Sequence, residues 1–114
     1  MAGAGLSTDF RSALVDTVVV IKASGGRLYN LFVTNPNTVS EWIQLFDLAP
    51  ADVTLGTTAP KISLGIPKGA SATDVGAMEA EWEEGVEFFT AMSYAATTSP
   101  TGLTPPTTGL TANA

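Results

Sequence analysis

Residues 25–47 read GGRLYNLFVTNPNTVSEWIQLFD, and this stretch decides the fold class. Two runs rich in aromatic and aliphatic residues, 27–34 and 39–47, flank a connection that contains Asn35, Pro36 and Asn37. Proline cannot donate to a sheet ladder, and asparagine tolerates the backbone of a tight turn, so the pattern predicts two strands joined as a β-hairpin. Because both faces of each run are largely apolar, we expect this hairpin inside a two-layer structure.

Three further segments indicate strands on either side of this stretch. Residues 15–22 include four consecutive β-branched side chains, which favour a pleated sheet over a helix. Residues 61–66 alternate strictly between apolar residues and polar or small ones, which is typical of a half-buried strand. Residues 91–97 predict another strand.

The segment AMEAEWEEGVEFFT, residues 77–90, permits two interpretations. Alanine and glutamate are good helix formers, and Met78, Trp82 and Phe89 would fall near one helical face. As a strand, the segment alternates glutamate with apolar residues over 78–83. Gly85 and the repulsion between glutamates four residues apart oppose a helix. We therefore predict a strand, a turn at residues 84–85 and then extended chain.

Composition restricts the possible functions of the 114 residues. The net charge of −6 lacks the basic footprint that nucleic acids require, and the longest apolar run is far too short to cross a membrane. The chain has no cysteine and no histidine, so Ser-His-Asp triads, thiolate sites and His-ligated zinc are impossible. We predict no enzymatic activity, no cofactor and no metal site, and synthesis in a cytoplasm because residues 1–10 do not resemble a secretion signal.

Two groups of side chains have a functional and a structural interpretation. The acidic row over residues 79–87 could bind a cation such as calcium, but a solvated strand face is the simpler interpretation. Trp42, Trp82 and Tyr94 could form a sugar-binding platform, although each lies in an alternating pattern that core packing explains. Both alternatives stay open at this stage.

The chain divides into three parts by composition. Residues 1–14 predict an N-terminal arm with a short helical turn over residues 10–14, residues 15–98 a β-sandwich domain, and residues 99–114 a C-terminal tail rich in Pro, Thr and Gly. Charged residues make up 14% of the chain against an average of about 25%, which indicates a surface partly covered by neighbours. We expect the extended ends to reach other subunits, with Phe10, Leu103 and Leu110 as partner contacts.

The order VVVIKASGGRLYNLFVTNPN, DVTLGTTAPKISLGIPKG and EWEEGVEFFTAMSYAATTSPTG, within residues 18–102, resembles small virion structural proteins of tailed phages. The resemblance implies an all-β fold, a single β-sandwich or jelly-roll-like domain of about seven to eight strands with extended N- and C-terminal segments. It implies a capsid decoration or cement protein in the virion. Such a protein bridges neighbouring subunits of the major capsid protein, or contacts another virion protein, as a homo-oligomer for which a trimer is expected.

Two other functions remain as alternatives from the sequence. The first is a tail, baseplate or fibre component of the virion. The second, from a different class, is a carbohydrate-binding module, which a coplanar exposed pair among the three aromatic residues named above would favour.

Overall fold

β-Strands form almost all the regular structure of the computed structural model, which describes residues 10–14, 18–71, 73–104, 106 and 110–113. The strands in these residues are β1 (Phe10–Leu14), β2 (Val19–Lys22), β3 (Gly26–Asn35), β4 (Glu41–Phe46), β5 (Ile62–Ile66), β6 (Gly76–Phe88), β7 (Met92–Thr97) and β8 (Leu110–Asn113). A single 3-10 turn over Pro50–Asp52 is the one helical element of this part of the chain.

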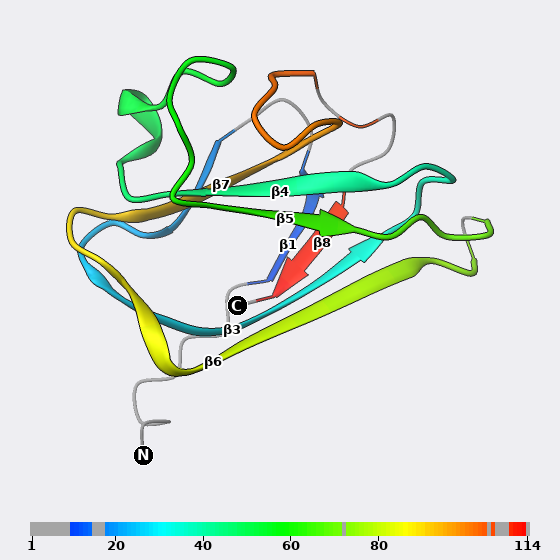
Figure 1. Cartoon of the computed structure of the whole chain (residues 1–114), viewed down its shortest axis with the longest axis horizontal. Helices are drawn as coiled ribbons and strands as arrows, with labels where there is room; N and C mark the ends of the chain where they lie inside the picture. Colours follow the sequence, from blue (N-terminus) through cyan, green and yellow to red (C-terminus); the bar gives the residue numbers. More distant parts are fainter. Residues whose placement is uncertain (1–9, 15–17, 72, 105, 107–109, 114) are drawn as a thin grey trace.

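The strands form two antiparallel sheets that lie on one another (Figure 1). Sheet A has the order β1-β8-β3-β6, and sheet B has the order β2-β7-β4-β5. The first strand therefore pairs with the last, the second with the seventh, the third with the sixth and the fourth with the fifth. This order arises when one long antiparallel ribbon is wrapped into two layers, which is the jelly roll. The predicted all-β sandwich is confirmed.

The predicted hairpin of residues 25–47 is wrong, although both of its strands are present. β3 belongs to sheet A and β4 to sheet B, so the connection between them crosses from one layer to the other. Asn35 lies at this crossing, and its side chain is completely buried. Its Nδ2 donates to the carbonyl oxygens of Val39 (3.0 Å), Ile66 (3.3 Å) and Pro67 (3.2 Å). Its Oδ1 accepts from the backbone and side-chain nitrogens of Asn37, both at 2.9 Å.

The core lies between the sheets and draws on strands from the whole length of the chain. Its fully buried members include Leu31, Val33, Ile43, Leu45, Ile66, Phe88, Tyr94, Leu110 and Ala112. Each large apolar side chain buried in this way contributes about 1.5–3 kcal/mol to folding relative to an exposed one. The predicted alternation of residues 61–66 is confirmed, since Ile62, Leu64 and Ile66 all pack against this core.

The sandwich extends beyond the limits predicted from composition. Residues 10–14, assigned to the arm and to a helical turn, form strand β1. Residues 110–113, assigned to the tail, form β8, which pairs with both β1 and β3. Apolar and polar residues alternate over 110–113, the period of a half-buried strand. Residues 1–9 and 15–17, part of the predicted arm and first strand, lie outside the described residues.

β6 confirms the strand interpretation of residues 77–90, with one difference. The predicted turn at residues 84–85 is a bulge inside a continuous strand of 13 residues. Residues 82–85 lie opposite the single residue Tyr29 of β3. Gly85 has a φ of 78°, a left-handed backbone that glycine adopts without steric cost. On β3 the bulge interrupts the period of two, so that Tyr29 and Asn30 are both exposed.

Asp47 holds the turn between β6 and β7 in place. Its carboxylate accepts hydrogen bonds from three successive backbone nitrogens, those of Phe89 (2.9 Å), Thr90 (2.7 Å) and Ala91 (3.3 Å). Partial burial raises the pKa of Asp47, but these hydrogen bonds and the charge of Lys61 outweigh it, so the pKa lies below its usual value of 3.8. The ionised form is therefore the one that the fold stabilises.

This arrangement predicts a stability that decreases in acid. Because the folded pKa of Asp47 is lower than the unfolded one, its contribution is complete above the unfolded value and is lost as the pH falls through 3.8 toward the folded value. We expect Asp47→Ala to lose about 1–2 kcal/mol of unfolding free energy at pH 7. When the free energy of unfolding is measured by urea titration between about pH 6 and pH 2, it should decrease less with acid for Asp47→Asn than for the wild type. Equal slopes for the two proteins would contradict this role.

Candidate interaction surface

The three predicted partner-contact residues have different environments. Leu110 lies in β8 with no exposed surface, so the prediction that it anchors a neighbouring subunit is wrong for this fold. Sequence reasoning assigned it to the C-terminal tail and missed its strand, because the strands that pair with β8 are distant in the chain. Leu103 is 61% exposed and stays a candidate. Phe10 lies in β1, but its side chain is outside the described residues.

Leu103 belongs to a loop that lies over the outer face of sheet B. The loop is closed by the Thr98 nitrogen, which donates to the Thr104 carbonyl at 2.9 Å. Gln44 of β4 donates to the Gly102 carbonyl at 3.0 Å, and Ser63 of β5 donates to the Pro100 carbonyl at 2.7 Å. Polar side chains on the outer face of the sheet thus fix the position of this loop.

A second loop meets the first at Leu103. Thr57 and Thr58 both donate backbone hydrogen bonds to the Thr54 carbonyl, which forms a tight turn around Gly56. A Cβ on Gly56 would come within 2.8 Å of Leu103 Cδ2, so the leucine side chain lies directly on this glycine. We call residues 53–60 and 98–104 together the loop cap. Leu103 is an exposed apolar side chain at the junction of its two loops.

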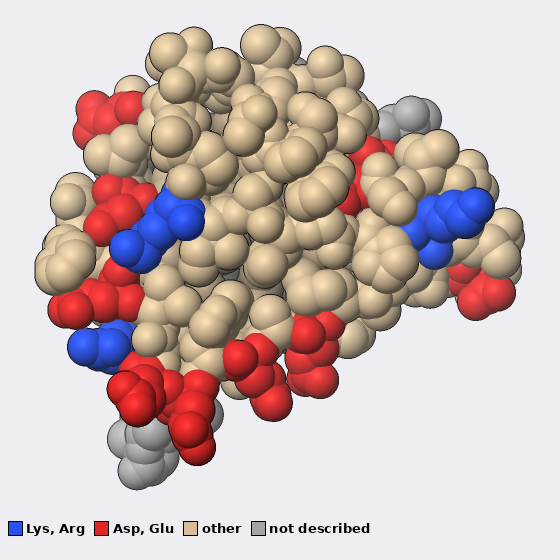
Figure 2. Space-filling view, in the orientation of Figure 1, with Lys and Arg blue, Asp and Glu red and all other residues tan. Residues whose placement is uncertain are grey.

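The loop cap carries no charged residue. Figure 2 shows an uncharged region at the top of the molecule, whereas acidic and basic side chains gather along the lower edge and at the two ends. Covering such a surface with another protein removes no ionised group from water, and so avoids the largest desolvation cost of association. The loop cap is therefore suited to adhesion, with Leu103 as its exposed apolar contact.

The acidic row lies on the outer face of β6. Glu79, Glu81 and Glu83 are exposed and alternate with partly buried residues that face the core. Farther along the strand, Glu87 forms an ion pair with Arg27 at 3.4 Å, with both side chains nearly half exposed. In the described part of the chain, no three acidic side chains converge in a way that could hold a metal ion. The exposure of Glu79, Glu81 and Glu83 agrees with the interpretation as a solvated strand face.

The aromatic residues considered for sugar binding do not form a common exposed platform. Tyr94 is 1% exposed and lies in the core, and Trp82 is partly buried against it. Trp42 is partly buried on sheet B, with its ring over Gly65. Among the side chains that the structure describes, the exposed aromatic ones are Tyr29, Phe32 and Phe89, which sequence reasoning did not select. For Phe89 the available signal was its place beside a turn, whereas the pairing of Phe32 with Glu79 of β6 is visible only in the strand register.

Glu41, at the start of β4, is a buried acid that sequence reasoning missed. Its side chain is 1% exposed, and its Oε1 has no hydrogen-bond partner among the described residues. By the period of two, it shares the face of Ile43 and Leu45, toward the core. Burial raises the pKa of Glu41 above its usual value of 4.5. The ionised carboxyl of Glu41 therefore lowers the stability of the fold near neutral pH.

Replacing Glu41 with glutamine is expected to increase stability at pH 7 by about 1–3 kcal/mol. Below the unfolded pKa of 4.5 the acid is neutral in both states, so its effect is absent there. As the pH rises through that value, ionisation of the unfolded chain draws the equilibrium toward unfolding. Chemical denaturation should therefore show a gain at pH 7 that disappears near about pH 3. The exposed Glu79→Gln serves as control, and a loss of stability in Glu41→Gln at pH 7 would contradict the prediction.

Comparison with models of known families, with curated protein sequences and with solved structures found no match. No helix among the described residues is long and apolar enough to cross a membrane. The fold is an all-β jelly roll that carries the uncharged loop cap over sheet B and the acidic row on the outer face of β6.

Proposed function

We propose that this chain is a structural protein of a tailed-phage virion, most simply a decoration or cement protein of the head. The observation that carries the proposal is the loop cap, an uncharged surface with an exposed leucine fixed on a rigid sheet. The resemblance of residues 18–102 to small virion proteins supports it. Under this proposal the loop cap contacts the major capsid protein, and the acidic outer face of β6 points away from it.

The mechanism is adhesive and needs no chemical step. Apolar surface covered at the junction of capsid subunits stabilises the head by about 25 cal/mol per Å², from which the costs of association are subtracted. Copies that bridge neighbouring subunits oppose their separation when the packaged genome presses outward. An oligomer, with a trimer as the expected form, would engage several subunits at once and gain from high effective concentration.

The test uses heads assembled without this protein, from the phage that encodes the chain. Purified wild type should bind them saturably and raise the temperature at which they release DNA. Leu103→Asp places a charge in the centre of the loop cap and should weaken binding at least about tenfold, as for a central contact. Val39→Asp changes a similarly exposed aliphatic residue outside the loop cap, 59% exposed, and should bind like the wild type.

Two results would contradict the proposal. Binding to isolated tails or baseplates and not to heads would favour the tail alternative. Equal binding by Leu103→Asp and Val39→Asp would exclude the loop cap as the contact surface. The mass of the purified protein in solution measures the oligomeric state independently, and a monomer would contradict the expected trimer.

A further inference from the structure

β6 is an edge strand of sheet A, and its outer edge has no strand partner among the described residues. The strand is 13 residues long and pairs only with β3 in this part of the chain. From Gly76 to Glu81 the pairing with β3 is regular, and the bulge begins only after Glu81. This regular stretch presents backbone donors and acceptors in a row, which is a template for one more strand.

The side chains along this edge differ on its two faces. Met78, Ala80 and Trp82 point toward the core but are only partly buried, so apolar surface is still open beside them. Glu79, Glu81 and Glu83 project from the outer face and are exposed. A strand that continued the sheet would therefore meet apolar side chains on one face and carboxylates on the other.

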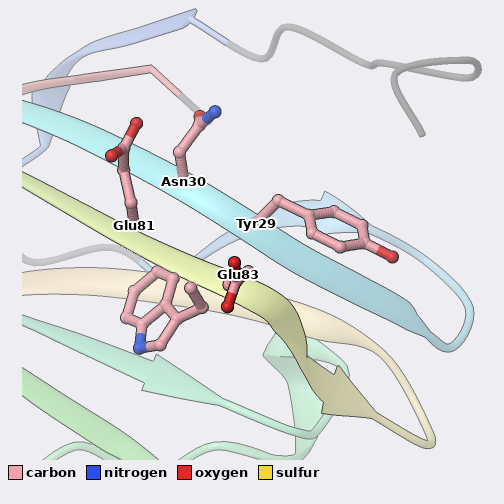
Figure 3. Close-up of a pocket in the computed structure, with 5 residues that line it drawn as sticks. Tyr29, Asn30, Glu81 and Glu83 are labelled. Carbon is pink, nitrogen blue, oxygen red and sulfur yellow. The ribbon is translucent and has the colours of Figure 1, made fainter. Parts of the chain in front are cut away.

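A hollow of about 540 Å³ lies where the regular half of β6 meets the bulge. It is lined by Tyr29, Asn30, Glu81, Trp82 and Glu83. Figure 3 shows Asn30 and Glu81 side by side, projecting to the same side of the β3–β6 pair. Glu81, Glu83 and Tyr29 offer two carboxylates and one aromatic ring at this hollow, whereas the Trp82 side chain faces the core. Such a surface is a suitable environment for an ammonium or guanidinium group, by charge and by cation–π contact.

We propose that the free edge of β6, over Gly76–Glu83, binds an extended segment of another protein in which apolar and cationic residues alternate. The apolar residues cover Met78 and Trp82, and the cationic ones pair with the glutamates and enter the hollow. A second copy of this β6 does not fit, because glutamates would face glutamates across the new strand pair and like charges there are destabilising. This surface is separate from the loop cap, and its test does not depend on the virion.

The experiment uses the full chain carrying Trp42→Phe, which leaves Trp82 as its single tryptophan. A capped peptide that alternates lysine with valine and threonine should change the fluorescence of Trp82 saturably. Amide hydrogen exchange of β6 should slow in the same complex. A peptide of identical sequence with alternate backbone nitrogens methylated keeps the charges but lacks donors for a strand pair, and should lose binding.

Charge reversal provides the matched comparison. Glu81→Lys with Glu83→Lys should weaken binding of the lysine peptide by roughly tenfold or more, and allow binding of the corresponding glutamate peptide. Asp52→Lys with Thr101→Lys raises the net charge by three units instead of four, at exposed positions away from this edge, and should alter binding by less than about threefold at moderate salt. Three results would each overturn the proposal. The two double variants could weaken binding of the lysine peptide equally, the methylated peptide could bind as tightly as the unmethylated one, or the lysine peptide could fail to bind the wild type.

Discussion

Replacing Asn35 with alanine is expected to lower the free energy of unfolding by about 3–5 kcal/mol, or to prevent folding. The truncation removes five hydrogen bonds at the corner where the chain passes from sheet A to sheet B. The carbonyl of Ile66 and the amide nitrogen of Asn37 are buried and would lose this partner. Each buried polar group left without a hydrogen bond costs about 1–3 kcal/mol. Urea denaturation followed by circular dichroism measures the loss.

Two further variants make this prediction specific. Asn30→Ala changes an exposed asparagine of the same strand and should alter stability by less than about 0.5 kcal/mol. Asn35→Asp keeps an acceptor for Asn37 but places a second oxygen against three carbonyl oxygens. It should be unstable at pH 7 and should recover in part when acid protonates the carboxyl. If Asn35→Ala proved as stable as Asn30→Ala, the corner would depend on other contacts.

The second large effect is expected at Gly76, where β6 begins. A Cβ at this position would lie 1.9 Å from the carbonyl oxygen of Pro67 and 2.7 Å from that of Lys68. Both obstacles are backbone atoms, so relief requires movement of the connection between β5 and β6. We expect Gly76→Ala to lose about 3 kcal/mol or more, at the upper end of the cost of overpacking. Thermal and urea denaturation both measure this difference.

Gly26, at the start of β3, is the matched control for this substitution. A Cβ there would meet only the side chain of Lys22, at 3.0 Å, and that flexible side chain can move. Gly26→Ala should therefore change stability by less than about 1 kcal/mol. Similar losses at the two glycines would show that backbone crowding is not what makes Gly76 sensitive.

The strands were predictable where a single local pattern accounts for them. Strict alternation over residues 61–66 identified β5, and glutamates alternating with apolar residues identified the first half of β6. In each case every second residue is apolar and faces the core, so the alternation in the sequence directly indicates a strand. The sequence predicted a turn at the place of the bulge. Gly85 indicates an unusual backbone conformation, but it does not indicate which strand lies opposite.

The candidate surface was only partly predictable. Leu103 was selected as an apolar residue in a polar segment, and it is exposed as expected. The contribution of residues 53–60 was missed, because they meet Leu103 only after both loops fold over sheet B. Leu110 was predicted as a partner contact for the same reason as Leu103. Its place in β8 depends on strand partners from the opposite end of the chain.

By itself the sequence determined that this is an all-β protein, where most of its strands lie, and that no histidine or cysteine chemistry is possible. Only the tertiary structure decided that β3 and β4 belong to different sheets and that residues 10–14 and 110–113 close sheet A. It also brought the uncharged residues 53–60 and 98–104 together as the loop cap. The physical reason is that alternation and turn residues act over a few neighbouring positions, whereas strand pairing and the crossing at Asn35 depend on contacts between distant segments.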